Sequence, residues 1–431
     1  MKSNQLRQRM RERGGQLRAR LTAQNLHAPS LDWLNFLIAD VRGALGPYVT
    51  VFLVAHQHWT PTSAGLVTTI GGLLGLLAQT PIGAWLDYTK HKRGAILLGL
   101  PIVSAAALII VWFPSFWPVL IANGAMQVAS GIFEPAVAAL TVGLFARNLL
   151  TRRMGRNAAW ARAGNIVVAI TSGAVAYLIS TQAVFLQVPV LAVLTGVVAM
   201  TIPYGKVDLR RARGSHDDKD ADAAKPSGWF AVFRSRPLLC FMVASLLYEL
   251  ADAPLLTLVG QKLGIGDPDK SLLLTSGLIV ASQAGMLIGA VAVGRWADRT
   301  GLTLPLLVSF AVLPVQAALT MMSDATAALL AIQVFGGLST GIFSALTPLW
   351  LADATSGSGR YNLSQGVAAT MRGIGVSMSG IAGGLLVDHF GYHAAFLACG
   401  VVGVAAGLLL WIGLRSDTAE TKSARVTYQS P

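Results

Sequence analysis

Long apolar runs alternate with short polar segments along almost the whole chain. A helix of about 20 apolar residues crosses the hydrocarbon core of a bilayer, at a rise of about 1.5 Å per residue. The pattern therefore predicts an all-α integral membrane protein with twelve transmembrane helices. The expected spans are residues 31–56, 62–86, 94–113, 117–145, 157–180, 183–203, 238–262, 271–296, 302–322, 325–352, 362–387 and 392–414.

Three polar segments divide this pattern. Residues 1–30 form a basic tail without the apolar core of a signal peptide, and we expect it to lie on anionic lipid headgroups rather than on nucleic acid. Residues 204–237 are charged and rich in helix breakers, which predicts a cytoplasmic linker. Residues 415–431 form a second cytoplasmic tail. The linker separates two predicted six-helix bundles, 31–203 and 238–414.

Short motifs of the first half return in the second half. Residues 83–87 recur as 294–298 at an offset of 211, and residues 131–133 recur as 341–343 at an offset of 210. Arg162 and Arg372 also stand 210 positions apart. Because these matches keep their order and nearly constant spacing, they predict that the two bundles are structural repeats.

Composition and charge agree with a membrane protein and give its orientation. Charged residues make up 12% of the chain and hydrophobic residues 54%, whereas a soluble chain carries about 25% charge. Of the 33 Lys and Arg residues, 28 fall in segments on the predicted side of the N-terminus, and two, Lys262 and Lys270, on the other. This asymmetry predicts cytoplasmic termini. With the short loops, it indicates a multi-pass protein of the inner (plasma) membrane.

The loop after the eighth span, Gly294-x-x-x-Asp298-Arg299-x-Gly301, resembles the loop signature of the major facilitator superfamily of secondary transporters. The resemblance extends to the twelve spans, the repeat and the central linker. The first copy departs from the signature at Tyr88 and Lys90. By resemblance, the cytoplasmic gate loops comprise Gly83, Asp87, Lys92, Arg93, Gly294, Asp298, Arg299 and Gly301.

The resemblance implies a role for these loops. Gly83 would let the second helix approach a neighbour closely. Asp87 would accept hydrogen bonds from the N-terminus of the eleventh helix, where the helix dipole favours anions, and so latch the outward-open state; Asp298 would act in the same way. The alternative is that both loops hold ordinary positive-inside residues and a helix stop.

Ionisable residues inside the spans are the strongest functional candidates, because each costs about 2.5–3.5 kcal/mol to insert. The resemblance implies that helices 1, 4, 7 and 10 line the transport cavity. Candidates for proton coupling and the substrate cavity are Asp40, Arg42, Glu134, Arg162, Glu249, Asp252 and Arg372, with Asn123 and Gln127 on one face of the fourth helix.

Two interpretations of these charges stay open. In the first, one or two acids, with Asp40 and Glu134 as the leading candidates, load and release protons while arginines tune them. In the second, the charges form fixed ion pairs between helices. Arg162 and Arg372, at equivalent repeat positions, fit either interpretation.

The chain shows no catalytic constellation, nucleotide-binding domain or metal-ligand spacing. We therefore expect a monomeric secondary transporter of a small molecule by alternating access, driven by the proton gradient and needing no cofactor; a non-transporting scaffold is the alternative. Asp40 favours proton-coupled export of small organic molecules. Against this, the helix 4 arginine and helix 5 Gly-Pro typical of the family's exporters are missing. The alternative direction is proton-coupled import of an anionic metabolite or siderophore-like compound, suggested by Arg42, Arg162 and Arg372.

Overall fold

A computed structural model describes residues 28–43, 45–89, 91–145, 147–202, 235–355 and 361–427. Within these ranges the regular structure is helical and no strand occurs. The helices are α2 (Pro29–Gly43), α3 (Leu45–Ala55), α4 (Pro61–Tyr88), α5 (Lys92–Trp112), α6 (Phe116–Leu144), α7 (Arg147–Leu178), α8 (Ala183–Met200), α9 (Arg236–Gly266), the 3₁₀ turn η5 (Pro268–Lys270), α10 (Ser271–Thr300), α11 (Thr303–Met322), α12 (Thr326–Ala354) and α13 (Tyr361–Thr427).

The predicted spans fall on these helices. Ten helical segments of the described residues are long and apolar enough to cross a membrane. The first predicted span corresponds to α2 and α3, and the last two both lie in α13, where Gly391 at φ 80° interrupts the helical backbone. The number twelve stays a prediction. Tail residues 1–27 and linker residues 204–234 lie outside the described part of the chain.

The buried side chains form two hydrophobic clusters. One contains residues between 31 and 202 together with Leu272, and the other contains residues between 238 and 414. Aromatic rings fill the second cluster, where Phe241 stacks on Trp350 with centroids 4.2 Å apart. We refer to helices α2–α8 as the N-half and to α9–α13 as the C-half.

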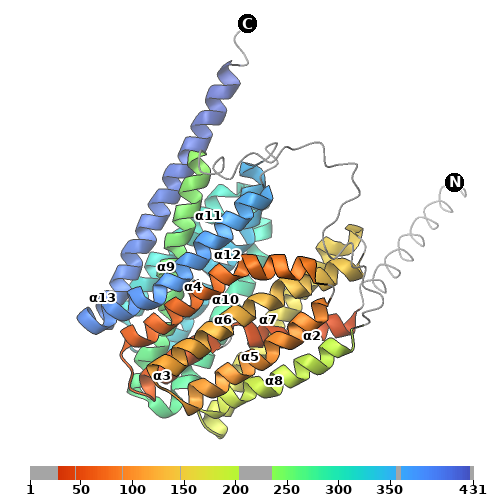
Figure 1. The fold of residues 1–431 in the computed structure, drawn as a ribbon. Helices are drawn as coiled ribbons and strands as arrows, with labels where there is room; N and C mark the ends of the chain where they lie inside the picture. The colour runs from red at the N-terminus through yellow and green to blue at the C-terminus, as the bar shows by residue number, and fades with distance from the viewer. Residues whose placement is uncertain are drawn as a thin grey trace, which may run out of the picture.

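The two ends of the helix bundle differ in their connections. At what we call the far end lie the loops 56–60, 113–115, 179–182 and 323–325, and there the Trp59 indole donates to the Pro114 carbonyl. At the opposite, near end, Ser30 meets Thr201 at 3.0 Å. Both described ends of the chain, Pro29 and the last turns of α13, belong to the near end (Figure 1).

Several helix pairs join the halves, and the two most extensive contacts are those of α4 with α13 and of α7 with α10. Small residues permit both. A Cβ added to Gly65 in α4 would lie 2.1 Å from the Gly380 carbonyl oxygen in α13, and one added to Gly173 in α7 would lie 2.8 Å from the Ser276 Cβ in α10. These backbones therefore approach more closely than side chains would allow. In Figure 1, α4 and α13 run beside each other on the left of the molecule.

Four hydrogen bonds between described residues connect the halves, and all involve the parts of these helices towards the far end. The Thr62 backbone N–H donates to Asp388 at 2.9 Å, and the Ile381 N–H donates to Thr69 at 2.9 Å. The other two bonds join α10 to helix α3 and the residue after it: Tyr48 with Ser276, and His56 with Ser271. These contacts close the far end in this conformation.

Candidate functional site

A cavity of about 350 Å³ lies between the two halves, beside the contacts that close the far end. Its walls come from α3, α4 and α6 of the N-half and from α9 and α13 of the C-half. The lining residues are Gly46, Pro47, Thr50, Pro61, Gly65, Thr68, Gly72, Asn123, Met126, Gln127, Ser130, Ala253, Pro254, Thr257, Leu258, Gln261, Val376, Ser377, Ser379, Gly380 and Gly384.

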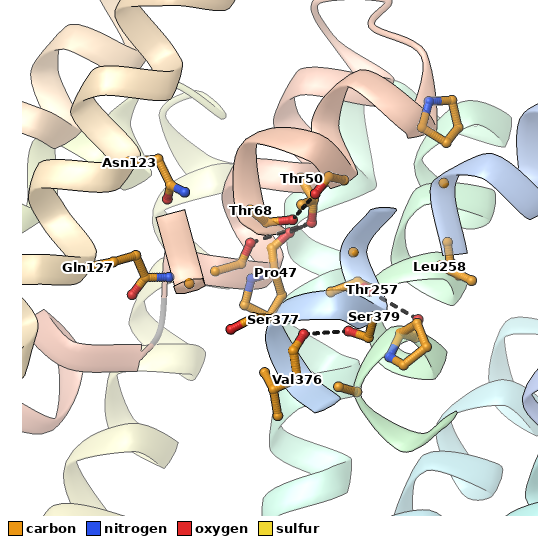
Figure 2. A pocket seen from close by; sticks show the side chains of 18 of the residues that line it. Pro47, Thr50, Thr68, Asn123, Gln127, Thr257, Leu258, Val376, Ser377 and Ser379 are labelled. Carbon is orange, nitrogen blue, oxygen red and sulfur yellow. Dashed lines mark hydrogen bonds between the residues drawn. The ribbon is translucent and has the colours of Figure 1, made fainter. Parts of the chain in front are cut away.

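The polar lining of this cavity consists of amides and hydroxyls. In the part of the chain that the structure describes, none of the lining side chains is charged. Figure 2 shows Asn123 and Gln127 pointing from α6 towards the hydroxyl residues of the C-half, among them Thr257 and Ser377. The Asn123 amide donates to the Val67 carbonyl at 3.0 Å, which fixes its orientation. Both residues were predicted to line the cavity from the sequence.

Gln261 is the most unusual polar residue of the lining. Its side chain is 4% exposed, and its amide oxygen is buried without a hydrogen-bond partner. An unsatisfied buried acceptor costs about 1–3 kcal/mol, so each one in a native structure needs an explanation. This oxygen has almost no solvent-accessible surface in this conformation, so a solute N–H or O–H group reaches it only if the amide turns into the cavity. Sequence reasoning missed Gln261 because a single glutamine near a helix end carries no pattern.

The helices around the cavity differ from those implied by the family resemblance. Helices 1, 4 and 7 contribute, as α3, α6 and α9, but α12, the predicted tenth helix, provides no lining residue. Instead α4 and α13 line it. The reason is their close crossing: glycines at 65, 72, 380 and 384 bring both helices against each other and against the cavity.

Glu249 and Arg372 form an ion pair between α9 and α13. The Arg372 Nε and Nη2 atoms donate to the same oxygen, Glu249 Oε1, at 2.7 and 2.6 Å. The guanidinium also lies over the ring of Phe343, 4.9 Å from its centroid. Next to the pair, a Cβ on Gly375 would lie 2.3 Å from the Leu246 carbonyl, so the two helices are in close contact here.

Asp252 lies three residues after Glu249 on α9 and has a different environment. Its Oδ2 atom accepts a hydrogen bond from the Thr340 hydroxyl of α12 at 3.0 Å. Thr340 also lies 3.4 Å from the Tyr248 hydroxyl, which in turn bonds to Ser339 at 2.7 Å. The Asp252 carboxyl therefore binds a network of neutral hydroxyl groups, whereas the Glu249 carboxyl binds the cationic side chain of Arg372.

The remaining predicted charges lie elsewhere. Glu134 is exposed and lines a second cavity of about 190 Å³ inside the N-half, together with Asn35 and Asn157. Arg162 is partly exposed on α7 and lines neither cavity. Asp40 and Arg42 belong to α2, but their side chains lie outside the described part of the structure.

The predicted gate loops lie at the near end. Lys92 is buried and donates to the Leu86 carbonyl, while Arg93 donates to the carbonyls of Met200 and Ile202, so both bind within the N-half. Gly301 ends α10 at φ 77°, a left-handed conformation that favours glycine.

The close approach predicted for Gly83 is not formed in this conformation. Asp298 and Arg299 are exposed, and the Asp87 side chain lies outside the described part. No heavy atom is within 4 Å of a Cβ placed on Gly83 or Gly294. This arrangement agrees with halves that meet at the far end, because the resemblance assigns the latch to the opposite, outward-open state.

A buried charge cluster at the near end was missed in the sequence. Arg153 and Arg156 of α7 both bind Asp32 of α2, each with a shortest distance of 2.6 Å. Arg153 is fully buried, lies over the Phe145 ring and also bonds to Asn157. The sequence placed both arginines in a cytoplasmic loop, because nothing in the local pattern showed that α7 begins at Arg147. Within the described residues, no group of three or more His, Cys, Asp or Glu is placed to hold a metal ion.

Comparison with known proteins relates this arrangement to transporters. A protein of Deinococcus radiodurans whose name describes it as a sugar efflux transporter is 24% identical over 426 residues, which cover 91% of this chain and all of that protein. A crystal structure of a mutant of the nucleoside transporter NupG superposes with a TM-score of 0.76 at 14% identity, covering 89% of this chain and 98% of that one. At this level of sequence identity, the similarity to NupG shows that the two proteins share a fold.

Family-level similarity extends over the chain. An uncharacterised MFS-type transporter of Mycobacterium tuberculosis is 36% identical over 394 residues, which are 91% of this chain and 94% of that protein. The model of the Major Facilitator Superfamily matches residues 32–315 and 250–430. The chain therefore belongs to the major facilitator superfamily, and it is a multi-pass membrane transporter.

Proposed function

We propose that this protein exports a small, neutral, polyhydroxylated solute by alternating access, in exchange for protons, across the inner membrane. The observation that carries this proposal is the cavity between the halves, whose described lining side chains are amides, hydroxyls and apolar groups without a charge. Amides and hydroxyls bind sugar-like hydroxyl groups in both donor and acceptor roles. The volume, about 350 Å³, lies at the small end of the range for ligand pockets.

Export is supported by two of the relatives. One is named for sugar efflux, and a protein of Streptomyces glaucescens named for tetracenomycin C resistance and export is 28% identical over 149 residues, 34% of this chain. If the basic near end is cytoplasmic, as the charge asymmetry predicts, the closed far end corresponds to an inward-open conformation that receives solute from the cell.

Import of an anionic compound, the alternative from the sequence, receives less support. An anion in a low-dielectric cavity needs a cationic partner, and the described lining provides none. Arg372 is already paired with Glu249, and Arg162 lies outside the cavity. Protonation of an acid elsewhere in the spans would still allow coupling to the proton gradient.

The proposal is tested with the purified protein in proteoliposomes and a panel of radiolabelled monosaccharides and disaccharides, each beside the corresponding uronic acid. A sugar and its uronic acid share the same ring and differ by a carboxylate in place of a CH2OH group, so the pair isolates the effect of charge. We expect counterflow of at least one neutral sugar and none of its acid. Counterflow of the acids alone would support the anion importer and overturn this proposal.

A further inference from the structure

Three of the acids predicted as coupling candidates have side chains that the structure describes, and their environments differ. Glu134 faces the second cavity of the N-half, Glu249 is in the ion pair with Arg372, and Asp252 accepts from a threonine hydroxyl. This inference rests on the proposed proton-driven transport, and it names the acid. We propose that Asp252 carries the coupling proton, while the Glu249–Arg372 pair is a fixed connection between α9 and α13.

Glu249 is tied to Arg372 by short contacts. Two guanidinium nitrogens bind one of its oxygens, and the aromatic face of Phe343 holds the arginine in place. Glu249 is 7% exposed, and a Cβ added to Gly375 would lie 3.1 Å from the Glu249 Cβ, so α13 packs closely beside it. Protonating this carboxyl would leave Arg372 without its counter-charge. A coupling acid must change protonation in each cycle, which this pair opposes.

Asp252, by contrast, is matched to both protonation states. The Thr340 oxygen lies 3.0 Å from Asp252 Oδ2 and 3.3 Å from the Gly336 carbonyl oxygen. When Asp252 is a carboxylate, the threonine hydroxyl donates to it. When the carboxyl is protonated, its O–H donates to Thr340, and the threonine hydrogen turns to the Gly336 carbonyl. One hydroxyl rotation therefore satisfies either state, and no heavy atom needs to move.

The charges around Asp252 require a proton for balance. Its own helix provides Glu249 and the Tyr248 hydroxyl, α12 provides Thr340, and α13 provides Arg372 and the Cys399 thiol. Among these groups the two carboxylates face a single arginine. Adding one proton to Asp252 brings the group to neutrality, which favours binding of a proton in a medium of low dielectric constant.

Asp252 is also connected to the solute cavity through the backbone. The next two residues of α9, Ala253 and Pro254, line the cavity, and so does Thr257. Pro254 lies inside the helix and cannot donate to the carbonyl four residues earlier, so α9 is weakened at this point. A change in the carboxyl's hydrogen bond to α12 therefore reaches the cavity within one helical turn.

The proposal is tested by infrared difference spectroscopy of the purified protein in lipid during a pH titration. This measurement follows the C=O stretch of protonated carboxylic acids and uses the proton itself as the probe. We expect a titrating band in the wild type that is lost in Asp252→Asn and kept in Asp252→Glu. In Thr340→Val we expect the band to persist with a shifted midpoint, because the hydroxyl partner is gone.

Two further variants keep the test decisive. Replacing the whole ion pair, in Glu249→Leu with Arg372→Leu, avoids an uncompensated arginine and should retain the Asp252 band in protein that remains monodisperse. The proposal would be overturned if the titrating band disappeared in Glu134→Gln and were the same in Asp252→Asn as in the wild type. Since no solute is present, this outcome is independent of whether the sugar panel reveals transport.

Discussion

Gly65 of α4 and Gly380 of α13 touch backbone to backbone across the two halves, so that a Cβ on Gly65 would lie 2.1 Å from the Gly380 carbonyl oxygen. One turn along, Gly384 meets the Pro61 carbonyl in the same way, at 2.4 Å. No side chain fits between these helices without separating them. The closed far end therefore depends on these glycines, and the first prediction concerns them.

Substitution of Gly65 by valine should open the far end. Overpacking of about 1–3 kcal/mol corresponds to a roughly 5–150-fold change in the equilibrium between conformations. With Cys240 and Cys399 replaced by alanine, a Thr257→Cys reporter in the cavity should react faster with an impermeant maleimide added from the far-end side. Gly155→Val in α7 is the control, since a Cβ there also meets nothing within 4 Å; equal labelling in both variants would contradict this role.

Acid should also destabilise the closed far end, because His56 is part of its contacts. Burial lowers the pKa of His56 below its usual value of 6.5, while its ring bonds to Ser271 of the C-half. The closed end thus binds a proton less tightly than a solvated histidine does. The contribution of His56 to the stability of the closed far end is fully present above about pH 6.5. This contribution is lost as the pH falls from there towards the lowered pKa of His56.

Labelling of the Thr257→Cys reporter as a function of pH measures this effect. The rate should rise on acidification in the wild-type background and rise much less in His56→Gln. The exposed His58 provides the control; a pH dependence that disappears in His58→Gln and persists in His56→Gln would refute the assignment.

The sequence predicts this fold well because membrane helices are encoded by local composition. Long apolar runs located the membrane helices. Helical spacing put Asn123 and Gln127 on one face of the fourth span, and in the structure both residues line the cavity between the halves. The bounds of the two bundles and the role of this cavity in transport stay predictions. What the sequence could not provide were the contacts between distant helices: Arg372 with Glu249, and Arg153 with Asp32, pair residues more than 100 positions apart.

Replacing Asp32 by asparagine should strongly destabilise the N-half. The fully buried Arg153 would lose its counter-charge, at a cost of about 3–5 kcal/mol. Unfolding in mixed micelles with increasing denaturing detergent would measure this loss. Asp353, exposed at the near end of α12, gives the control, because Asp353→Asn should change the stability by about 0.5 kcal/mol or less. Similar losses in the two variants would show that the cluster contributes little.

Truncating the unpaired acceptor in the cavity should weaken solute binding. Gln261→Leu keeps much of the side-chain volume but removes the oxygen, so one hydrogen bond worth about 0.5–1.5 kcal/mol is lost. We expect the KM for sugar counterflow to rise up to about tenfold. Gln333 is equally buried but does not line the cavity, so Gln333→Leu should leave KM unchanged. An unchanged KM in Gln261→Leu would remove this residue from the binding site.

Proton-driven export of a neutral solute is tested most directly by flux in proteoliposomes whose protein has its near end facing outward. A pH gradient with an acidic lumen is imposed, and a radiolabelled neutral sugar from the panel is added outside. We expect accumulation of the sugar above its external concentration, collapse of this accumulation by a protonophore, and its loss in Asp252→Asn. Accumulation when the outside is the acidic side would show that protons and solute move together, and would contradict proton-driven export.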